Sequence, residues 1–146
     1  MELGDWEEAS KELDRISPPR RGHPSVLEVR WQVCAKTKKW EMATKVAQEM
    51  AEKLPDHPLG FIHQAYSLHE LKRTQEAYAV LLPVADKFPD LIIRYNLACY
   101  CCQLGELTES MQWLGKAIEL AGKNHIRLMA LDDEDLQPLW GKISSI

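Results

Sequence analysis

Apolar residues recur at helical spacing along most of the chain. In one stretch they are separated by four, three and three residues, and in the next by four, three and four. The residues concerned are Phe61, Ala65, Leu68 and Leu71, then Ala77, Leu81, Val84 and Phe88. Such spacing places them on one face of a helix, and proline and glycine fall mostly between the stretches, where helices end. No alternating pattern typical of strands competes with this one, so we predict an all-α fold.

The same local signal returns at nearly equal intervals along the chain. Three similar segments each follow a polar turn; they are Trp40-Glu41-Met42-Ala43, Thr74-Gln75-Glu76-Ala77 and Leu107-Thr108-Glu109-Ser110. If Lys38, Lys72 and Gly105 are equivalent turn positions, the period is about 34 residues. Each unit is then a helix, a tight turn and a second antiparallel helix. Because one such pair cannot bury both of its faces, we expect stacked pairs to form a right-handed solenoid with a concave and a convex surface.

A period of this length with two helices resembles the tetratricopeptide repeat (TPR) family. The matching residues of the third predicted repeat are Leu97, Ala98, Cys101, Gly105, Leu107, Ser110, Leu114 and Ala117. The resemblance implies one domain over 1–146, made of a half repeat (1–17), three repeats (24–57, 58–90 and 91–123) and capping helices (124–146). Trp31 stands where the family's pattern has glycine or alanine, so its neighbour must leave room. We expect that room to come from the absence of a first helix before Gly4.

Local signals add detail to these elements. His23 and His57 each precede a proline and lie one period apart, so we expect them to mark helix starts rather than to bind ligands. In the tail, Asp132 and Asp133 can cap a final helix from Glu134 to Lys142. By its register, Trp113 falls on a less buried face.

Composition and charge exclude several classes of function. Lys plus Arg is 18 and Asp plus Glu is 22, and like charges do not form long runs. We therefore expect no nucleic-acid partner and no membrane anchor. The first residues lack the basic region and apolar stretch of a secretory signal, which favours a cytoplasmic location with reduced cysteines.

Motifs for catalysis are absent from the sequence. It has no glycine-rich phosphate loop, no Gly-x-Ser-x-Gly elbow, no His-Glu-x-x-His and no pair of Cys-x-x-Cys motifs. We therefore predict that the chain is not an enzyme and needs no cofactor. One alternative is a thiol- or metal-dependent sensor, because Cys99 and Cys102 share a helix face and His69 lies at the equivalent place one repeat earlier. The simpler interpretation is that these cysteines pack as small apolar residues.

The resemblance also implies where a ligand would bind. TPR ligands usually lie in the concave groove lined by the first helices, and the positions carried over are Gln32, Lys36, Ile62, Tyr66, His69, Tyr95, Cys99 and Cys102. Family members that hold the acidic C-terminus of a chaperone use a clamp of Lys, Arg and Asn. Here the clamp positions hold Glu28, Gln32, His63 and Ile92, so that clamp is missing.

The predicted groove is apolar and aromatic, which suits an extended or helical peptide with apolar anchors. We expect Ile62, Tyr66, Tyr95 and Cys99 to form a patch at its centre. The prediction is thus a non-catalytic scaffold that binds another protein or peptide. Two alternatives stay open: the C-terminal tail fills the groove, or the chain forms a homodimer through an open N-terminal edge beside Trp6 and Trp31.

Overall fold

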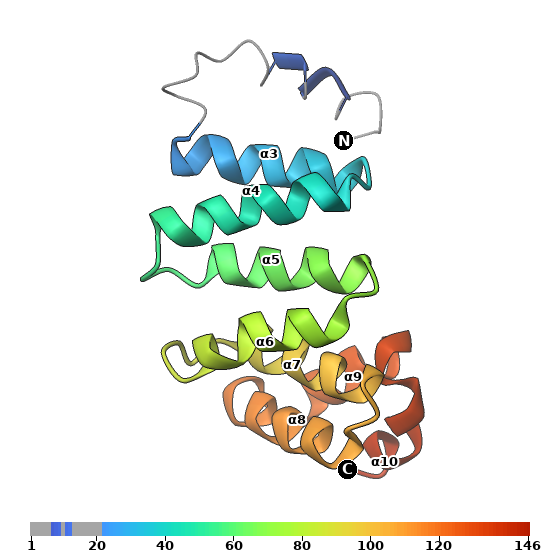
Figure 1. Cartoon of the computed structure of the whole chain (residues 1–146). Helices are drawn as coiled ribbons and strands as arrows, with labels where there is room; N and C mark the ends of the chain where they lie inside the picture. Colours follow the sequence, from blue (N-terminus) through green and yellow to red (C-terminus); the bar gives the residue numbers. More distant parts are fainter. Residues whose placement is uncertain (1–6, 10, 13–21) are drawn as a thin grey trace. The chain divides into compact units, whose positions relative to one another are not determined.

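The computed structural model describes residues 7–9, 11–12 and 22–146. These residues form helices, turns and bends and contain no strand (Figure 1), so the prediction of an all-α fold is confirmed for them. Most of the predicted half repeat (1–17), including Trp6, lies outside the described residues. Contacts within the chain divide it into two compact units, Met1–Arg73 and Thr74–Ile146. Across the described ranges, no helix has both the length and the apolar character needed to cross a bilayer.

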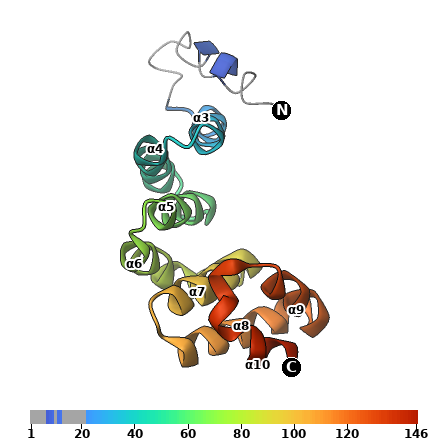
Figure 2. The same ribbon diagram turned by 90° about the vertical axis from the view of Figure 1, so that its right-hand side faces the viewer.

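From residue 22 onward, the described part of the first unit contains three helices that pack in consecutive order. Helix α3 (Pro24–Lys36) packs against α4 (Trp40–Lys53), and α4 packs against α5 (Leu59–Glu70) (Figures 1 and 2). Their approach is close at Gly60, where an added Cβ would lie 2.5 Å from the backbone nitrogen of Ala51. Only glycine fits there without moving the backbone of α4.

Histidine side chains cap two of these helices. His23 Nδ1 accepts a hydrogen bond from the Ser25 N–H at 3.3 Å, and His57 Nδ1 accepts one from the Leu59 N–H at 3.2 Å. Each bond satisfies a donor that the first turn of a helix leaves without a partner. The prediction that both histidines mark helix starts is confirmed.

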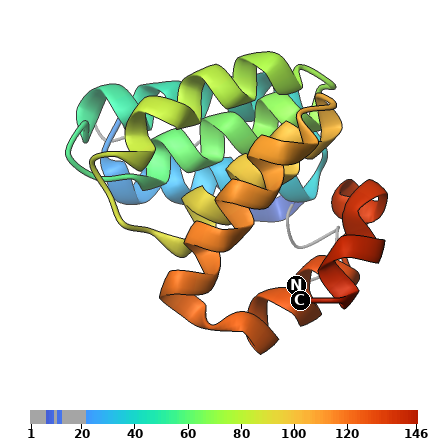
Figure 3. The same cartoon turned by 90° about the horizontal axis from the view of Figure 1, so that it is seen from below.

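The second unit contains six helical elements. They are α6 (Thr74–Ala85), α7 (Leu91–Gln103), α8 (Leu107–Ala121), α9 (Lys123–Leu131), the 3-10 helix η1 (Glu134–Leu139) and α10 (Trp140–Ser144). Helix α7 packs against α6 and α8, and η1 returns to pack against α7. The chain bends sharply between α8 and α9 (Figure 3), where Gly122 has a φ of 87°.

The C-terminal segment differs from the single final helix that we predicted. It is divided into η1 and α10, and Pro138 lies inside η1. Proline cannot donate a backbone hydrogen bond, so a regular α-helix is disfavoured at this point. The predicted capping role of Asp133 is confirmed, because its side chain accepts a hydrogen bond from the Asp135 N–H at 3.0 Å.

Three turns between helices have the same backbone geometry. Lys38, Lys72 and Gly105 all have a positive φ, of 58°, 65° and 83°. In each turn, the residue that follows donates its N–H to the carbonyl five residues earlier, at 2.8 to 2.9 Å. The three bonds join Lys39 to Cys34, Arg73 to Leu68, and Glu106 to Cys101. The positions that the sequence aligns as turns therefore share one conformation.

Candidate functional site

Trp31 is the centre of an aromatic cluster between α3 and α5. Its ring stacks on His63 with a centroid distance of 3.6 Å and an interplanar angle of 8°. Its indole Nε1–H donates to the Ser67 hydroxyl at 2.9 Å, and that hydroxyl donates to the His63 carbonyl at 2.8 Å. Ser67 is fully buried. Trp31 thus packs against α5, whereas the stretch before Gly4, from which we expected the room for this side chain to come, lies outside the described residues.

Glu28 extends this cluster with a carboxylate. Its Oε2 lies 2.9 Å from His63 Nε2, and its Oε1 accepts a hydrogen bond from the Gln32 amide at 2.9 Å. A carboxylate only accepts, so His63 must carry a proton on Nε2. Burial lowers the pKa of His63 below its usual value of 6.5, although the neighbouring Glu28 opposes that shift. At neutral pH the donors to Glu28 are therefore a neutral imidazole and a neutral amide.

Tyr66 completes the cluster and is its most exposed aromatic residue. It makes an edge contact with Trp31 at 6.1 Å and a tilted contact with Trp40 at 5.7 Å. Its exposed fraction is 42%. We define the Trp31 cluster as Glu28, Trp31, His63, Tyr66 and Ser67. It presents an aromatic ring to solvent on a base that is held by stacking and hydrogen bonds.

The other predicted groove residues of the first unit differ in exposure. Gln32 and Lys36 are exposed on α3, whereas Ile62 is buried and His69 is half-buried on α5. The structure therefore joins Gln32 to the Trp31 cluster through Glu28. It leaves Ile62 as a core residue, one helical turn before Tyr66.

The predicted groove residues of the second unit are covered by the C-terminal segment. The Tyr95 hydroxyl donates to Asp133 at 2.8 Å, and the Cys99 thiol donates to the same carboxylate oxygen at 3.6 Å. Tyr95, Cys99 and Cys102 are all buried. Burial, with the neighbouring Cys99 and Asp133, raises the pKa of Tyr95, so its hydroxyl stays a donor. These residues attach the C-terminal cap to α7.

The four cysteines are free and buried. Burial raises the pKa of each thiol, that of Cys101 to about 12, and at Cys99 the carboxylates of Asp133 and Asp135 add to the effect. Ligand atoms of Cys99, Asp133 and Asp135 lie within 4.8 Å of one another. This group differs from the predicted set of Cys99, Cys102 and His69, whose members belong to both units. Protonated thiols are weak ligands and weak nucleophiles.

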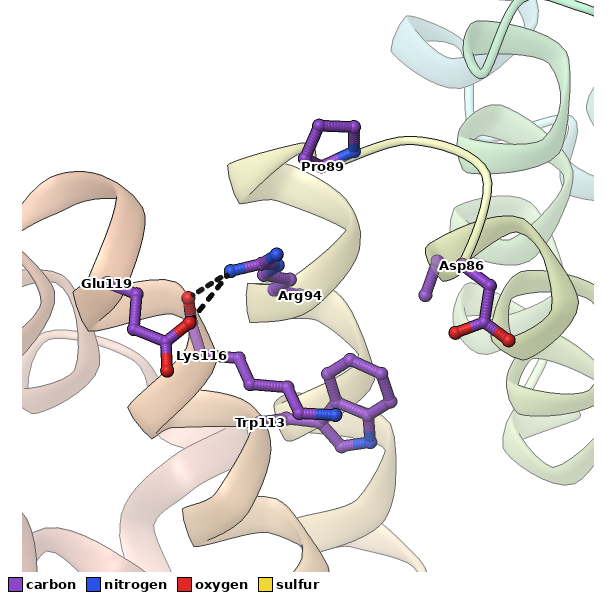
Figure 4. Close-up of a pocket in the computed structure, with 7 residues that line it drawn as sticks. Asp86, Pro89, Arg94, Trp113, Lys116 and Glu119 are labelled. Carbon is purple, nitrogen blue, oxygen red and sulfur yellow. Dashed lines mark hydrogen bonds and ion pairs between the residues drawn. The ribbon is translucent and has the colours of Figure 1, made fainter.

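A polar cleft of about 450 Å³ opens in the second unit (Figure 4). Its lining residues are Ala85, Asp86, Pro89, Arg94, Trp113, Lys116 and Glu119. Arg94 donates to the Lys116 carbonyl at 2.6 Å and pairs with Glu119 at 3.5 Å, and the Lys116 ammonium lies 4.3 Å from the ring centroid of Trp113. Trp113 is only 8% exposed, so the expectation of a less buried face is wrong. The two cations and two carboxylates of this cleft balance in charge.

A smaller pocket of about 230 Å³ lies in the first unit, and sequence reasoning missed it. It lies where the first turns of α3 and α5 meet the last turn of α4. The residues that line it are Pro24, Ser25, Glu28, Met50, Leu54, His57, Leu59 and Gly60. Two of them belong to His-Pro helix starts, which is the only signal in the sequence that points here. Glu28 is shared between this pocket and the Trp31 cluster.

In comparisons with known proteins, the chain matches no family model, no curated protein and no solved structure.

Proposed function

We propose that the chain is a non-catalytic helical scaffold of the TPR kind that binds another protein or peptide. The regular period of the sequence supports this, as does the shared geometry of the turns at Lys38, Lys72 and Gly105. Helix pairs joined by short turns and stacked at a regular period are typical of α-helical solenoids. The raised thiol pKa values favour this role over a thiol-based sensor.

The binding surface that we propose is the Trp31 cluster with Gln32 and Lys36. The observation that carries the proposal is an exposed tyrosine ring supported by two tryptophans. A rigid aromatic side chain loses little conformational entropy on binding, which is why such residues often dominate the affinity of interfaces. In the second unit, the corresponding positions are Tyr95 and Cys99, which donate hydrogen bonds to Asp133 of the C-terminal segment. The first unit is therefore where a peptide would bind.

Selection of peptides from a displayed random library against the full chain tests this proposal. The binding site of a selected peptide can be located by chemical-shift changes in a ¹⁵N-labelled sample. We expect changes at the Trp31 indole N–H and along α5. Tyr66→Ala should weaken binding about tenfold, which corresponds to about 1.4 kcal/mol.

A matched control is available on α4. Met42 is an exposed apolar residue, like Tyr66, but it takes no part in the Trp31 cluster. Met42→Ala should change the affinity less than about twofold, as expected for a residue outside the binding centre. If Met42→Ala abolishes binding and Tyr66→Ala does not, the proposed surface is wrong.

A further inference from the structure

The pocket of the first unit has the size and lining for a single apolar side chain. Met50, which is buried, lines the pocket together with Leu54 and Leu59. Its volume is about 230 Å³, and an apolar cavity of about 150 Å³ already accommodates benzene. A leucine or phenylalanine side chain therefore fits, and its burial would be favourable because the lining is mostly apolar.

One charged group faces this apolar space. Glu28 lines the pocket, and its side chain is only 27% exposed. Both of its oxygens are held by hydrogen bonds, one from Gln32 and one from His63. Among the residues that the structure describes, no lysine or arginine pairs with it. Because both donors are neutral at pH 7, the described part of the chain orients the negative charge of Glu28 but does not compensate it.

A partly desolvated carboxylate without a cation is a strong determinant of what can bind beside it. A second carboxylate would be repelled, and a neutral polar group would gain little. A positively charged group that arrives with the ligand would supply the cation that no described residue places beside Glu28, and the hydrogen bonds from Gln32 and His63 already hold the carboxylate in position. The charge therefore selects among peptides that all supply the apolar side chain.

We infer that this pocket is an anchor site for a peptide in which a bulky apolar residue is followed by lysine or arginine. The apolar side chain enters between the ends of α3, α4 and α5, and the adjacent cation pairs with Glu28. The inference rests on the proposed function, since it names the class of peptide that the scaffold recognises. Glu28 also joins the pocket to the Trp31 cluster, so one peptide can contact both.

The test uses the full chain and four labelled peptides that differ at two positions. The reference peptide is Gly-Ser-Leu-Arg-Ser-Gly, and the others replace Leu by Ala, Arg by Gln, or Arg by Glu. Fluorescence anisotropy gives each affinity. We expect the reference peptide to bind about fivefold more tightly than the Gln peptide and to exceed the Glu peptide by more, because of the charge of Glu28. Loss of the leucine side chain should weaken binding about tenfold.

Two variants test the charge of the pocket and its apolar space separately. Glu28→Gln keeps the size and an acceptor oxygen but removes the charge, so it should abolish the preference for Arg over Gln. Ser25→Phe places a ring at the rim and should weaken binding of the reference peptide about tenfold by filling the space. Thermal unfolding of both variants, compared with the wild type, shows that they are folded.

The outcomes separate this inference from the proposed function. If Ser25→Phe and Glu28→Gln leave every affinity unchanged while Tyr66→Ala still weakens the library-selected peptides, the pocket inference is overturned and the scaffold function stands. If no library peptide binds the chain, the proposed function fails first. A dimer in sedimentation that Ser25→Phe abolishes would assign the pocket to a second copy and would also overturn the inference.

Discussion

Two serines, Ser67 and Ser110, are buried. We expect the loss of each hydroxyl group to lower the free energy of unfolding by an amount that depends on its hydrogen-bond partner. The Ser67 hydroxyl is the acceptor for the Trp31 indole N–H. In Ser67→Ala that donor loses its partner in a partly buried place, and an unsatisfied donor costs about 1–3 kcal/mol. Urea unfolding followed by circular dichroism should show a loss of that size.

Ser110→Ala is the matched control for that variant. The Ser110 hydroxyl donates to the Ala98 carbonyl at 2.6 Å, but this carbonyl lies inside α7 and also has a donor within the helix. Alanines at the matching positions, Ala43 and Ala77, are fully buried without a hydroxyl. We expect Ser110→Ala to cost less than about 1 kcal/mol. Equal losses for the two serines would contradict the role given to Trp31.

His63 makes the stability of the first unit depend on pH. In the unfolded chain its pKa is near 6.5, and in the folded chain burial lowers it. Above pH 6.5 both states are neutral and the full stability is present. As the pH falls below 6.5, the unfolded chain binds the proton first, so the free energy of unfolding decreases until the folded pKa is also passed.

A variant separates this effect from the other titrating groups. His63→Phe keeps a ring over Trp31 but cannot bind a proton, so the urea midpoint of the variant should fall less between pH 7 and pH 5 than that of the wild type. The imidazole of His63 can be followed directly by NMR, where its titration should have a midpoint below 6.5. A midpoint above 6.5 would show that Glu28 outweighs burial.

At the level of elements, the three turns with positive φ give a test of local conformation. A lysine in the left-handed region costs about 1–2 kcal/mol, partly offset by the lower chain entropy of lysine relative to glycine when unfolded. Lys38→Gly and Lys72→Gly should therefore raise the free energy of unfolding by up to about 1 kcal/mol. Gly105→Ala should lower it by about 1 kcal/mol. Denaturant unfolding of the three variants measures these changes, and a neutral Gly105→Ala would contradict the shared geometry.

The helices and their turns could be predicted because their signals are local. The polar turns and the His-Pro pairs lie within a few residues of the helix ends that they define. The alignment of Lys38 with Lys72 and Gly105 was sufficient to find positions that share a backbone conformation. In the tail, by contrast, Pro138 lies inside a 3-10 helix, and the acidic cap at Asp133 indicated a helix start but not its type.

The contacts of the candidate site could not be predicted, because they join distant residues. Glu28 and His63 are 35 residues apart, and Trp31 and Ser67 are 36 apart. The predicted period assigns such residues to neighbouring repeats, but it does not give the side-chain torsion angles. Trp31 turns toward α5, where its indole N–H donates to the Ser67 hydroxyl. The pocket is formed by three helix ends, and the His-Pro pairs mark only two of them.

At the scale of the whole molecule, the two units differ in how far they bury the positions that the sequence aligns: Tyr66 is exposed in the first unit and Cys99 is buried in the second. In the second unit, Asp133 accepts from Tyr95 and Cys99, and the C-terminal segment buries the face of α7. In the first unit, Tyr66 stays exposed beside Trp31. A terminal cap hides apolar surface that would otherwise be in contact with water. In the proposed scaffold, the covered face of the second unit would contribute stability, and the exposed face of the first unit would be the one that binds a peptide.

The buried cysteines give a prediction for the intact chain. All four thiols are buried with raised pKa values, so few thiolates are present at pH 8. Iodoacetamide should alkylate none of them at an appreciable rate in the folded protein and all four in concentrated urea, as mass spectrometry can count. Rapid alkylation of Cys99 or Cys102 in the folded chain would favour a thiol-based sensor.

Zinc should likewise leave the stability of the folded chain unchanged. Binding to Cys99, Asp133 and Asp135 would require the Cys99 thiol to lose its proton beside two carboxylates, and Asp133 to give up the hydrogen bond from Tyr95. A ligand at 100 times its Kd adds about 2.7 kcal/mol to the free energy of unfolding, which a thermal scan detects easily. We expect the unfolding temperature to be the same with excess zinc and with EDTA. An increase with zinc that Cys99→Ala removes would instead show a metal site between α7 and the C-terminal cap.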